Sequence, residues 1–421
     1  MGDLEAAGER KPFVVYWMKF PSPYFVDRCN AVIARGKLDL EVWFDVRQPD
    51  KWAWDIDESQ WSFPARYVPT RRLWGRPNRI PLPELSGRRP DLFVCEYDSA
   101  QLSLGFLAAR AVADRTAFRV LTTFDAWSRR TWWREAGKHL VFRAVDGAKV
   151  GGLDGARLAE RYGLPADRTW DVTQSIDVLH YASAAATDSD ERERARRELG
   201  LSGTVLIYVG RLWEGKGVGH LIDAYSGLAG CGEAVSLLLV GTGPDEEAYR
   251  SRTKEVPGVV FAGWQQRDQM PGFYSLADVM VFPTLGDPNG LVVTEALAAG
   301  LPVVSSDAAG NIHRRLPPDG PGLVVPAGDV GALRQALQRL MVDEDLRTSM
   351  AAQALQHVRH MDPDRYAADF ESFVHGVLGK PRRRTVAALV ARMVGRALQR
   401  YGATAMAPAA PLVDESAVIR A

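Results

Sequence analysis

Two carboxylates and a glycine-containing turn stand close together in the second half of the sequence. Asp287 and Glu295 are eight residues apart in the segment D-P-N-G-L-V-V-T-E-A-L-A-A-G. A carboxylate on a loop and another in the following helix can bind two parts of one polyhydroxyl ligand. Between them lies a helix N-terminus, where unpaired amides and the helix dipole favour an anion. These amides belong to Asn289, Gly290, Leu291 and Val292. The segment predicts a ligand with both hydroxyl and phosphate groups.

The same segment has an ordinary alternative interpretation. Asp, Pro, Asn and Gly together are common in surface turns. Glu295 would then be a helix-surface glutamate. The segment alone does not separate the two interpretations.

Two cations follow a short apolar run about eighty residues earlier. Residues 205–209 are typical of a buried parallel strand, and Gly210, Arg211 and Lys216 follow on the next loop. Open α/β sheets bind ligands at such strand ends. Arg contacts a phosphate through a planar fork and Lys as a point charge, so the pair predicts a diphosphate site. The alternative is two solvated charges on a surface loop.

The motifs around this pair form a recognisable series. G-R-L-W-E-G-K-G is followed in order by L-L-L-V-G-T-G-P, V-V-F-A-G-W, A-D-V-M-V-F-P-T and the segment with the two carboxylates. Together they resemble the C-terminal domain of retaining glycosyltransferases of the family 4 type. The resemblance is specific over about residues 200–345 and weaker before them. It implies an α/β protein with the GT-B fold: two doubly wound, Rossmann-like domains facing each other across a cleft, with a C-terminal helix crossing back to the first domain.

The resemblance also implies roles for the polar residues. Arg211 and Lys216 would hold the donor diphosphate, Glu295 the ribose and Asp287 the transferred sugar, and these four form the expected catalytic set. The family usually has Glu at the position of Asp287, so this chain departs from the pattern there. The donor site is expected to include Gly210, Gly241, Trp264, Asn289, Gly290, Leu291 and Val292. The co-substrate is a nucleoside-diphosphate sugar, with UDP or GDP left open, and no cofactor is expected.

The acceptor is expected on the first half of the chain, at Ser22, Asp125 and Trp127. Relatives often carry a histidine after the strand expected at 118–125, where this chain has Phe124 and Asp125. Asp125 would hold an acceptor hydroxyl or cap the next helix. Trp127 would stack on a sugar ring or pack into the core. The acceptor class stays open between a glycan, a lipid-linked molecule and a small molecule.

Strand and helix patterns alternate as in a parallel doubly wound sheet. We expect an N-terminal acceptor-side domain at 1–177 and a C-terminal domain that binds the nucleotide-sugar at 178–360. A crossover helix is expected at 361–380, followed by a basic helix and a disordered tail at 381–421. Residues 46–90 have little periodicity and are interpreted as long loops beside the cleft.

The basic helix has six arginines and no acidic residue between 382 and 400. An apolar stripe runs beside them, which is typical of a helix on an anionic membrane surface. Its residues are Val386, Leu389, Val390, Met393 and Ala397. The alternatives are a solvated helix and a contact with a protein partner.

Composition excludes some functions. The formal net charge is zero, so no global field attracts nucleic acid. Cys29, Cys95 and Cys231 lack the spacing of metal ligands or disulfides, which fits a reducing compartment. We find no signal peptide or membrane-spanning run. The sequence therefore predicts a cytoplasmic protein, with peripheral contact at the inner face of the membrane through residues 382–400.

No metal site is expected. Asp-x-Asp triplets occur at 55–57, 188–190 and 343–345, in a loop and two charged helical runs. None ends a strand, as a metal-binding triplet should. We therefore expect metal-independent transfer. Two alternatives stay open: another GT-B enzyme such as a nucleotide-sugar epimerase, and a non-catalytic partner subunit.

Overall fold

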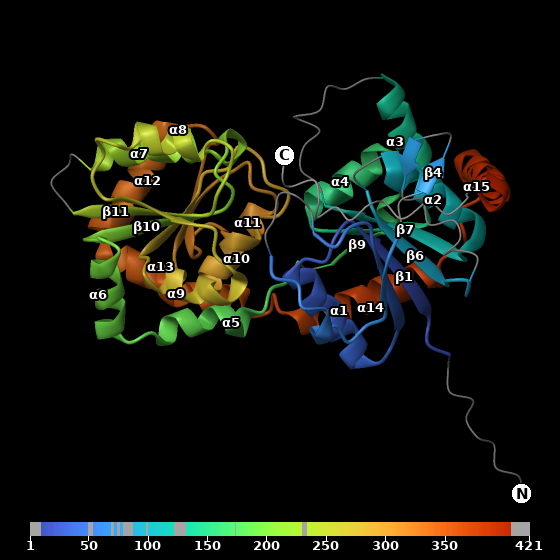
Figure 1. Cartoon of the computed structure of the whole chain (residues 1–421), viewed down its shortest axis with the longest axis horizontal. Helices are drawn as coiled ribbons and strands as arrows, with labels where there is room; N and C mark the ends of the chain where they lie inside the picture. Colours follow the sequence, from blue (N-terminus) through green and yellow to red (C-terminus); the bar gives the residue numbers. More distant parts are fainter. Residues whose placement is uncertain are drawn as a thin grey trace, which may run out of the picture.

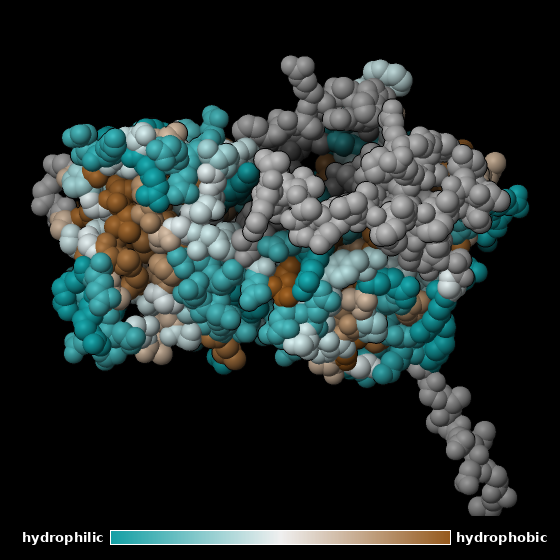
Figure 2. All heavy atoms as spheres, in the orientation of Figure 1, coloured by the Kyte–Doolittle hydropathy of each residue, from teal (hydrophilic) through white to brown (hydrophobic). Residues whose placement is uncertain are grey.

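Two parallel sheets, each with helices on both faces, form the molecule (Figure 1). The structure is a computed structural model. It describes residues 10–48, 54–68, 71–73, 76–78, 87–97, 100–121, 132–172, 174–229 and 234–405. Hydrophilic residues predominate on the described surface in the view of Figure 2.

The first domain contains a parallel sheet of seven strands. Its apolar strands are buried because helices cover both faces, as the unbroken run F-V-V-Y-W-M in β1 illustrates. In spatial order the strands are β3 (Ala65–Tyr67), β2 (Asp39–Phe44), β1 (Phe13–Met18), β6 (Leu92–Glu96), β7 (Arg115–Val120), β8 (Gly147–Val150) and β9 (Thr169–Asp171). One face packs on α1 (Pro23–Arg35) and α14 (Pro363–Gly379). The other packs on α2 (Ala100–Val112), α3 (Trp132–Ala144), α4 (Leu153–Arg161) and α15 (Val386–Ala405).

The second domain has a parallel sheet of six strands. In spatial order they are β12 (Val259–Gly263), β11 (Val235–Val240), β10 (Thr204–Val209), β13 (Val279–Phe282), β14 (Val303–Ser306) and β15 (Gly322–Val325). One face packs on α7 (Val218–Leu228), α8 (Glu246–Arg252) and α12 (Val330–Val342). The other packs on α5 (Val178–Ala182), α9 (Met270–Ser275), α10 (Leu291–Ala298), α11 (Ile312–Arg315) and α13 (Glu344–Val358). The remaining helix, α6 (Ser189–Glu198), leads into β10.

The chain returns to the first domain after α13. The aromatic face of α14 packs on α1 and on the first sheet, where the Phe370 ring stacks on Tyr16 with centroids 5.6 Å apart. The expected crossover helix is confirmed, as is the fold class. The domain boundaries at 177 and 360 stay predictions.

Several local expectations were wrong. The strand expected at 118–125 is β7, which ends at Val120, and residues 122–125 lie outside the described residues. The expected loop at 46–90 contains strand β3, a 3₁₀ turn at Glu58–Gln60 and the hairpin of β4 (Arg71–Leu73) and β5 (Arg76–Asn78). β3 is a short, exposed edge strand, so its sequence carries no buried apolar run.

The Asp-x-Asp triplets at 55–57, 188–190 and 343–345, and a fourth at 362–364, lie at helix starts. The carboxylates of Asp57, Asp188 and Asp343 accept hydrogen bonds from N–H groups in the first turns that follow them. These aspartates are N-caps, a position that Asp favours.

Candidate active site

Glycines end the three neighbouring strands on which the donor site was predicted. Gly210, Gly241 and Gly263 follow or end β10, β11 and β12, and all have positive φ angles. A Cβ atom on Gly241 would lie 2.0 Å from the carbonyl oxygen of Gly210. Only glycine therefore lets these two loops approach so closely at the carboxyl edge of the sheet.

Lys216 reaches the predicted sugar-binding carboxylate. It ends a 3₁₀ turn, Glu214–Lys216, and the following Gly217 has φ +70°. A side chain on Gly217 would collide with the carbonyl of Pro283, just after β13, so this turn packs closely there. Lys216 Nζ forms an ion pair with Asp287 Oδ2, and the two side chains are only 20% and 17% exposed. The sequence placed these residues in one site, and the structure brings them into contact.

Asp287 also fixes the turn that precedes α10. Its Oδ1 accepts hydrogen bonds from the N–H groups of Asn289 at 2.8 Å and Gly290 at 2.6 Å. Burial raises the pKa of the carboxyl, but the charge of Lys216 and these hydrogen bonds outweigh it, so the net pKa is lowered. Asp287 is therefore held as a carboxylate.

The expectation of four unpaired amides was wrong for two of them. Asn289 and Gly290 donate to Asp287. Leu291 and Val292 are the first two residues of α10, and N–H groups there have no intrahelical acceptor. The anion site predicted at this helix start is therefore limited to the backbone N–H groups of Leu291 and Val292.

Glu295 lies at the boundary between the domains and is only 1% exposed. Its Oε1 accepts a hydrogen bond from the Tyr24 hydroxyl of α1 at 2.7 Å, and its Oε2 accepts one from Tyr274 of α9 at 2.8 Å. Burial raises the pKa of Glu295, and the two tyrosine hydrogen bonds reduce this shift. A carboxylate oxygen has more than one acceptor position, so these bonds leave room for a further donor on each oxygen.

A buried arginine supports the loop with Asp287, and the sequence interpretation missed it. Arg315 is 4% exposed and donates to Asn289 Oδ1 at 2.8 Å, Thr294 Oγ1 at 2.9 Å and the Gly310 carbonyl at 3.2 Å. Burial lowers its pKa to about 10, so it stays charged at neutral pH. Arg315 thus joins α10, its preceding loop and the loop before α11. Nothing in the sequence distinguishes it from its exposed neighbour Arg314.

The remaining donor-site predictions lie near the same edge. Arg211 is partly buried, with its guanidinium 6.0 Å from the ring centre of Trp213. The Trp264 ring lies 6.4 Å from that of Trp54 of the first domain. Both rings therefore lie where the domains meet.

The acceptor side is only partly described. Ser22 is the N-cap residue of α1. Asp125 and Trp127 lie outside the described residues.

The domains touch through charged pairs and leave a small space between them. Arg267 pairs with Asp27 at 2.8 Å, and Arg314 pairs with Asp171 at 2.5 Å. A nearby cavity of about 20 Å³ is lined by Gly151, Asp171, Gln174, Asn289, Asn311, Arg314, Arg315 and Met361. It has room for about one water molecule, whereas ligand pockets begin at roughly 300 Å³. This cavity cannot hold a nucleotide-sugar in the present domain arrangement.

Within the described ranges, no three His, Cys, Asp or Glu side chains are grouped so that they could hold a metal ion. None of the described helices combines the length and apolar composition that a bilayer span requires.

Comparison with known proteins agrees with this geometry. Residues 203–343 match the family model described as glycosyl transferases group 1. Phosphatidyl-myo-inositol mannosyltransferase of Mycobacterium leprae is 38% identical over 164 residues, which is 38% of this chain and 43% of that protein. Alpha-D-kanosaminyltransferase of Streptomyces kanamyceticus is 28% identical over 245 residues, covering 56% of this chain and 59% of its own. The chain spans about half the length of the curated relatives that it matches.

Solved structures resemble the whole fold. HepE of Anabaena, in complex with UDP-glucose, aligns over 86% of this chain and 99% of its own, with a TM-score of 0.68 and 16% identity. Sucrose-phosphate synthase of Thermosynechococcus elongatus aligns over 88% of this chain and 100% of its own, with a TM-score of 0.69 and 17% identity. The chain therefore has the GT-B architecture of glycosyltransferases. Its second domain resembles the glycosyl transferases group 1 over residues 203–343.

Proposed function

We propose that the chain is a retaining glycosyltransferase that moves a sugar from a nucleoside-diphosphate sugar to an acceptor hydroxyl. The observation that supports this most strongly is the ion pair between Lys216 and Asp287 beside the start of α10. This pair places Lys216, a cation that can bind phosphate, next to Asp287, an ionised carboxylate that can bind sugar hydroxyls. Glu295, one and a half turns into α10, is then the group for the ribose.

The positive groups stabilise the leaving nucleoside diphosphate. Charge develops on its phosphate as the bond to the sugar breaks, and preorganised cations and amides stabilise such charge. Lys216, Arg211 and the N–H groups of Leu291 and Val292 take this role. The acceptor oxygen attacks the anomeric carbon on the face from which the diphosphate leaves. The departing phosphate oxygen takes the acceptor's proton, and attack from that same face retains the anomeric configuration.

The relatives support a range of acceptors. One is named for phosphatidyl-myo-inositol and another for 2-deoxystreptamine. HepE was solved with UDP-glucose. We accordingly propose a glycan, lipid-linked or small-molecule acceptor, with UDP or GDP as the nucleotide.

The transfer is proposed to be independent of metal. The aspartate triplets serve as helix caps, and cations of the protein itself lie at the predicted diphosphate site. Chelation with EDTA should therefore leave the rate of sugar transfer nearly unchanged. Loss of activity that manganese or magnesium restores would contradict this mechanism.

The location is proposed to be the cytoplasm, with peripheral contact at the inner face of the membrane. Cys29 and Cys95 are buried free thiols, which fits a reducing compartment. The segment expected to touch the membrane is the basic helix at residues 382–400.

A panel of ligands tests the donor assignment. Thermal shifts would be measured for the wild-type chain with UDP, GDP, ADP and their sugars, because a ligand that binds the native state raises its melting temperature. We expect UDP or GDP and one of its sugars to raise it, and the shift to shrink in Lys216→Ala. Absence of any shift at saturating concentrations of all these ligands would contradict the proposal.

A further inference from the structure

Helix α15 has apolar residues on two faces. Small residues lie on the inner face, which packs on the first domain, and larger residues lie on the outer face, which is exposed. Its inner face consists mainly of small residues, Ala388, Ala391 and Gly395, together with Leu398, and packs on α2 and α3. A Cβ atom on Gly395 would lie 1.9 Å from the Leu107 carbonyl oxygen of α2. In Figure 1, α15 lies at the end of the first domain farthest from the second.

The outer face of α15 exposes large apolar side chains. Val386 is 80% exposed, Leu389 61% and Met393 63%. Their spacing of three and four residues places them on one stripe of the helix. Val390 at 40% and Val394 at 39% widen this stripe. Single exposed hydrophobic residues are normal, but a contiguous group of five marks an interaction surface.

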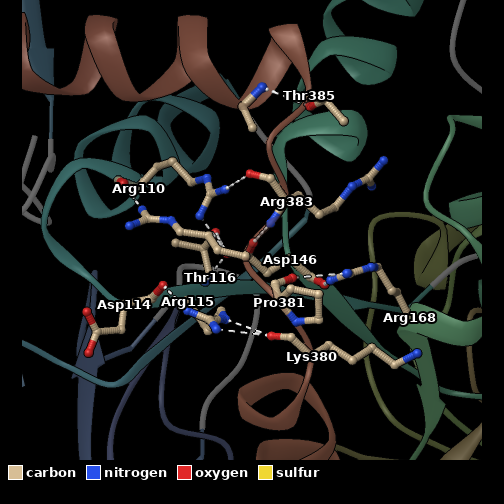
Figure 3. Close-up of polar contacts among 12 residues, drawn as sticks. Arg110, Asp114, Arg115, Thr116, Asp146, Arg168, Lys380, Pro381, Arg383 and Thr385 are labelled. Atoms are coloured by element: carbon tan, nitrogen blue, oxygen red, sulfur yellow. Dashed lines mark hydrogen bonds and ion pairs between the residues drawn. The ribbon is translucent and has the colours of Figure 1, made fainter.

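The start of α15 is fixed by a buried polar anchor (Figure 3). Asp146, which is fully buried, accepts from the Arg383 backbone N–H at 2.8 Å and from Arg110 at 2.6 Å. Arg115 donates to the Lys380 carbonyl at 3.0 Å, and Arg168 donates to that of Pro381 at the same distance. The segment between α14 and α15 is thereby held against the first domain.

The hydrogen bonds of this anchor change the role expected for two of the basic residues, which the sequence assigned to contact with the membrane. Arg382 donates to the Arg110 carbonyl, and Arg383 donates to the carbonyls of Phe142 and Gly163. These two arginines therefore hold the helix in place. Arg384 and Arg396 are exposed beside the apolar stripe.

The positive charge beside the outer face of α15 favours an anionic partner. Residues 381–405 contain no Asp or Glu. A second copy of α15 would bring arginine against arginine, whereas an anionic surface complements the charge. Apolar residues flanked by cations on a helix favour the headgroup region of an anionic bilayer.

We propose that the outer face of α15 docks the protein on a membrane that contains anionic lipids. Val386, Leu389 and Met393 enter the boundary between headgroups and acyl chains, and Arg384 and Arg396 bind lipid phosphates. The helix is already folded and anchored, so docking orders little additional chain. This specifies the peripheral contact proposed above, and it does not depend on sugar transfer.

Vesicle co-sedimentation of the full chain tests the docking surface. Phosphatidylcholine vesicles would be compared with vesicles that also contain phosphatidylglycerol, and we expect binding only to the latter. The double change Leu389→Gln with Met393→Gln should lower the partition coefficient about tenfold or more. Arg396→Gln should lower it about fivefold and weaken its salt dependence. Leu179→Gln is the matched control, because Leu179 is 83% exposed on α5 of the second domain.

The outcomes separate a membrane from other partners. All substituted residues are exposed, so the melting temperature should stay at the wild-type value in each variant. Equal binding to both vesicle types, or unchanged binding by the double variant, would overturn the proposal. So would a dimer in solution that the double variant loses, without vesicle binding by the wild type. Nucleoside diphosphate shifts in the same preparations show independently whether the donor site is intact.

Discussion

At the scale of residues, Lys216 gives the sharpest prediction. Lys216→Ala, and separately Arg211→Ala, should lower turnover about a hundredfold or more, as removal of one electrostatic stabiliser does in other enzymes. The reason is loss of positive charge at the departing diphosphate. In Lys216→Ala, Asp287 also loses its counterion, which adds to the effect. Steady-state kinetics of sugar transfer would measure both variants.

The control for Lys216 is an exposed lysine on the same domain. Lys254 lies on the surface after α8, so Lys254→Ala should keep wild-type turnover. A folded Lys216→Ala protein that turns over like the Lys254 variant would remove Lys216 from the mechanism.

Glu295 gives a prediction about pH. Its pKa is raised in the folded state, mainly by burial, so its contribution to stability is complete below the unfolded pKa of about 4.3 and is lost as pH rises through the folded value. Glu295→Gln does not titrate, and Gln still accepts one tyrosine hydrogen bond. The melting temperature of the variant, relative to wild type, should therefore increase with pH above about 4.3 and then level off. If the difference in melting temperature between Glu295→Gln and wild type does not change with pH over this range, the pKa of Glu295 is not raised in the folded protein.

Sequence patterns predicted which residues carry chemistry but not which residues support them. Lys216 and Asp287 could be placed in one site because their motifs end neighbouring strands of a parallel sheet. Arg315 could not, because its three partners come from loops that meet only in the folded chain. The pairing of Asn289 and Gly290 with Asp287 depends on the turn conformation, with Gly290 at φ +53°.

At the scale of elements, buried strands were predictable and edge elements were not. Continuous apolar runs mark β1 and β10, because both faces of a parallel sheet are covered. The short edge strand β3 and the hairpin of β4 and β5 lack such runs. The crossover of α14 was implied by the family resemblance, and the aromatic residues of this helix form part of the core of the first domain.

The contact between α15 and α2 gives a prediction at this scale. Gly395→Ala would bring a methyl group against the Leu107 carbonyl, so α15 must shift, and overpacking of this kind costs roughly 1–3 kcal/mol. Gly137→Ala in α3 is the control, because a Cβ there meets nothing within 4 Å and helix propensity improves. Urea unfolding should show a loss for the first variant and none for the second. Equal stability of the two variants would mean that α15 does not pack on α2 in this way.

At the scale of the whole molecule, contacts between domains cover the predicted donor site. Tyr24 of the first domain donates to Glu295 of the second, and Arg267 pairs with Asp27 across the same boundary. The cavity beside Asn289 is too small for a nucleotide-sugar. We therefore expect donor binding to be accompanied by a movement of the two domains at this boundary. The sequence could predict two domains with a cleft, but not how closely they approach.

We propose that two residues of one short segment recognise different parts of the donor: Asp287 binds the sugar, and Glu295 binds the nucleotide. Calorimetric titration of free nucleoside diphosphate into Asp287→Asn and Glu295→Gln tests it, with transfer measured in parallel. We predict that Asp287→Asn greatly reduces transfer and keeps nucleoside diphosphate affinity within a few-fold of wild type, since the nucleotide lacks the sugar that Asp287 binds. Glu295→Gln should weaken nucleotide binding itself, through loss of a charged acceptor for the ribose hydroxyls. An equal loss of nucleotide affinity in both variants would contradict this division.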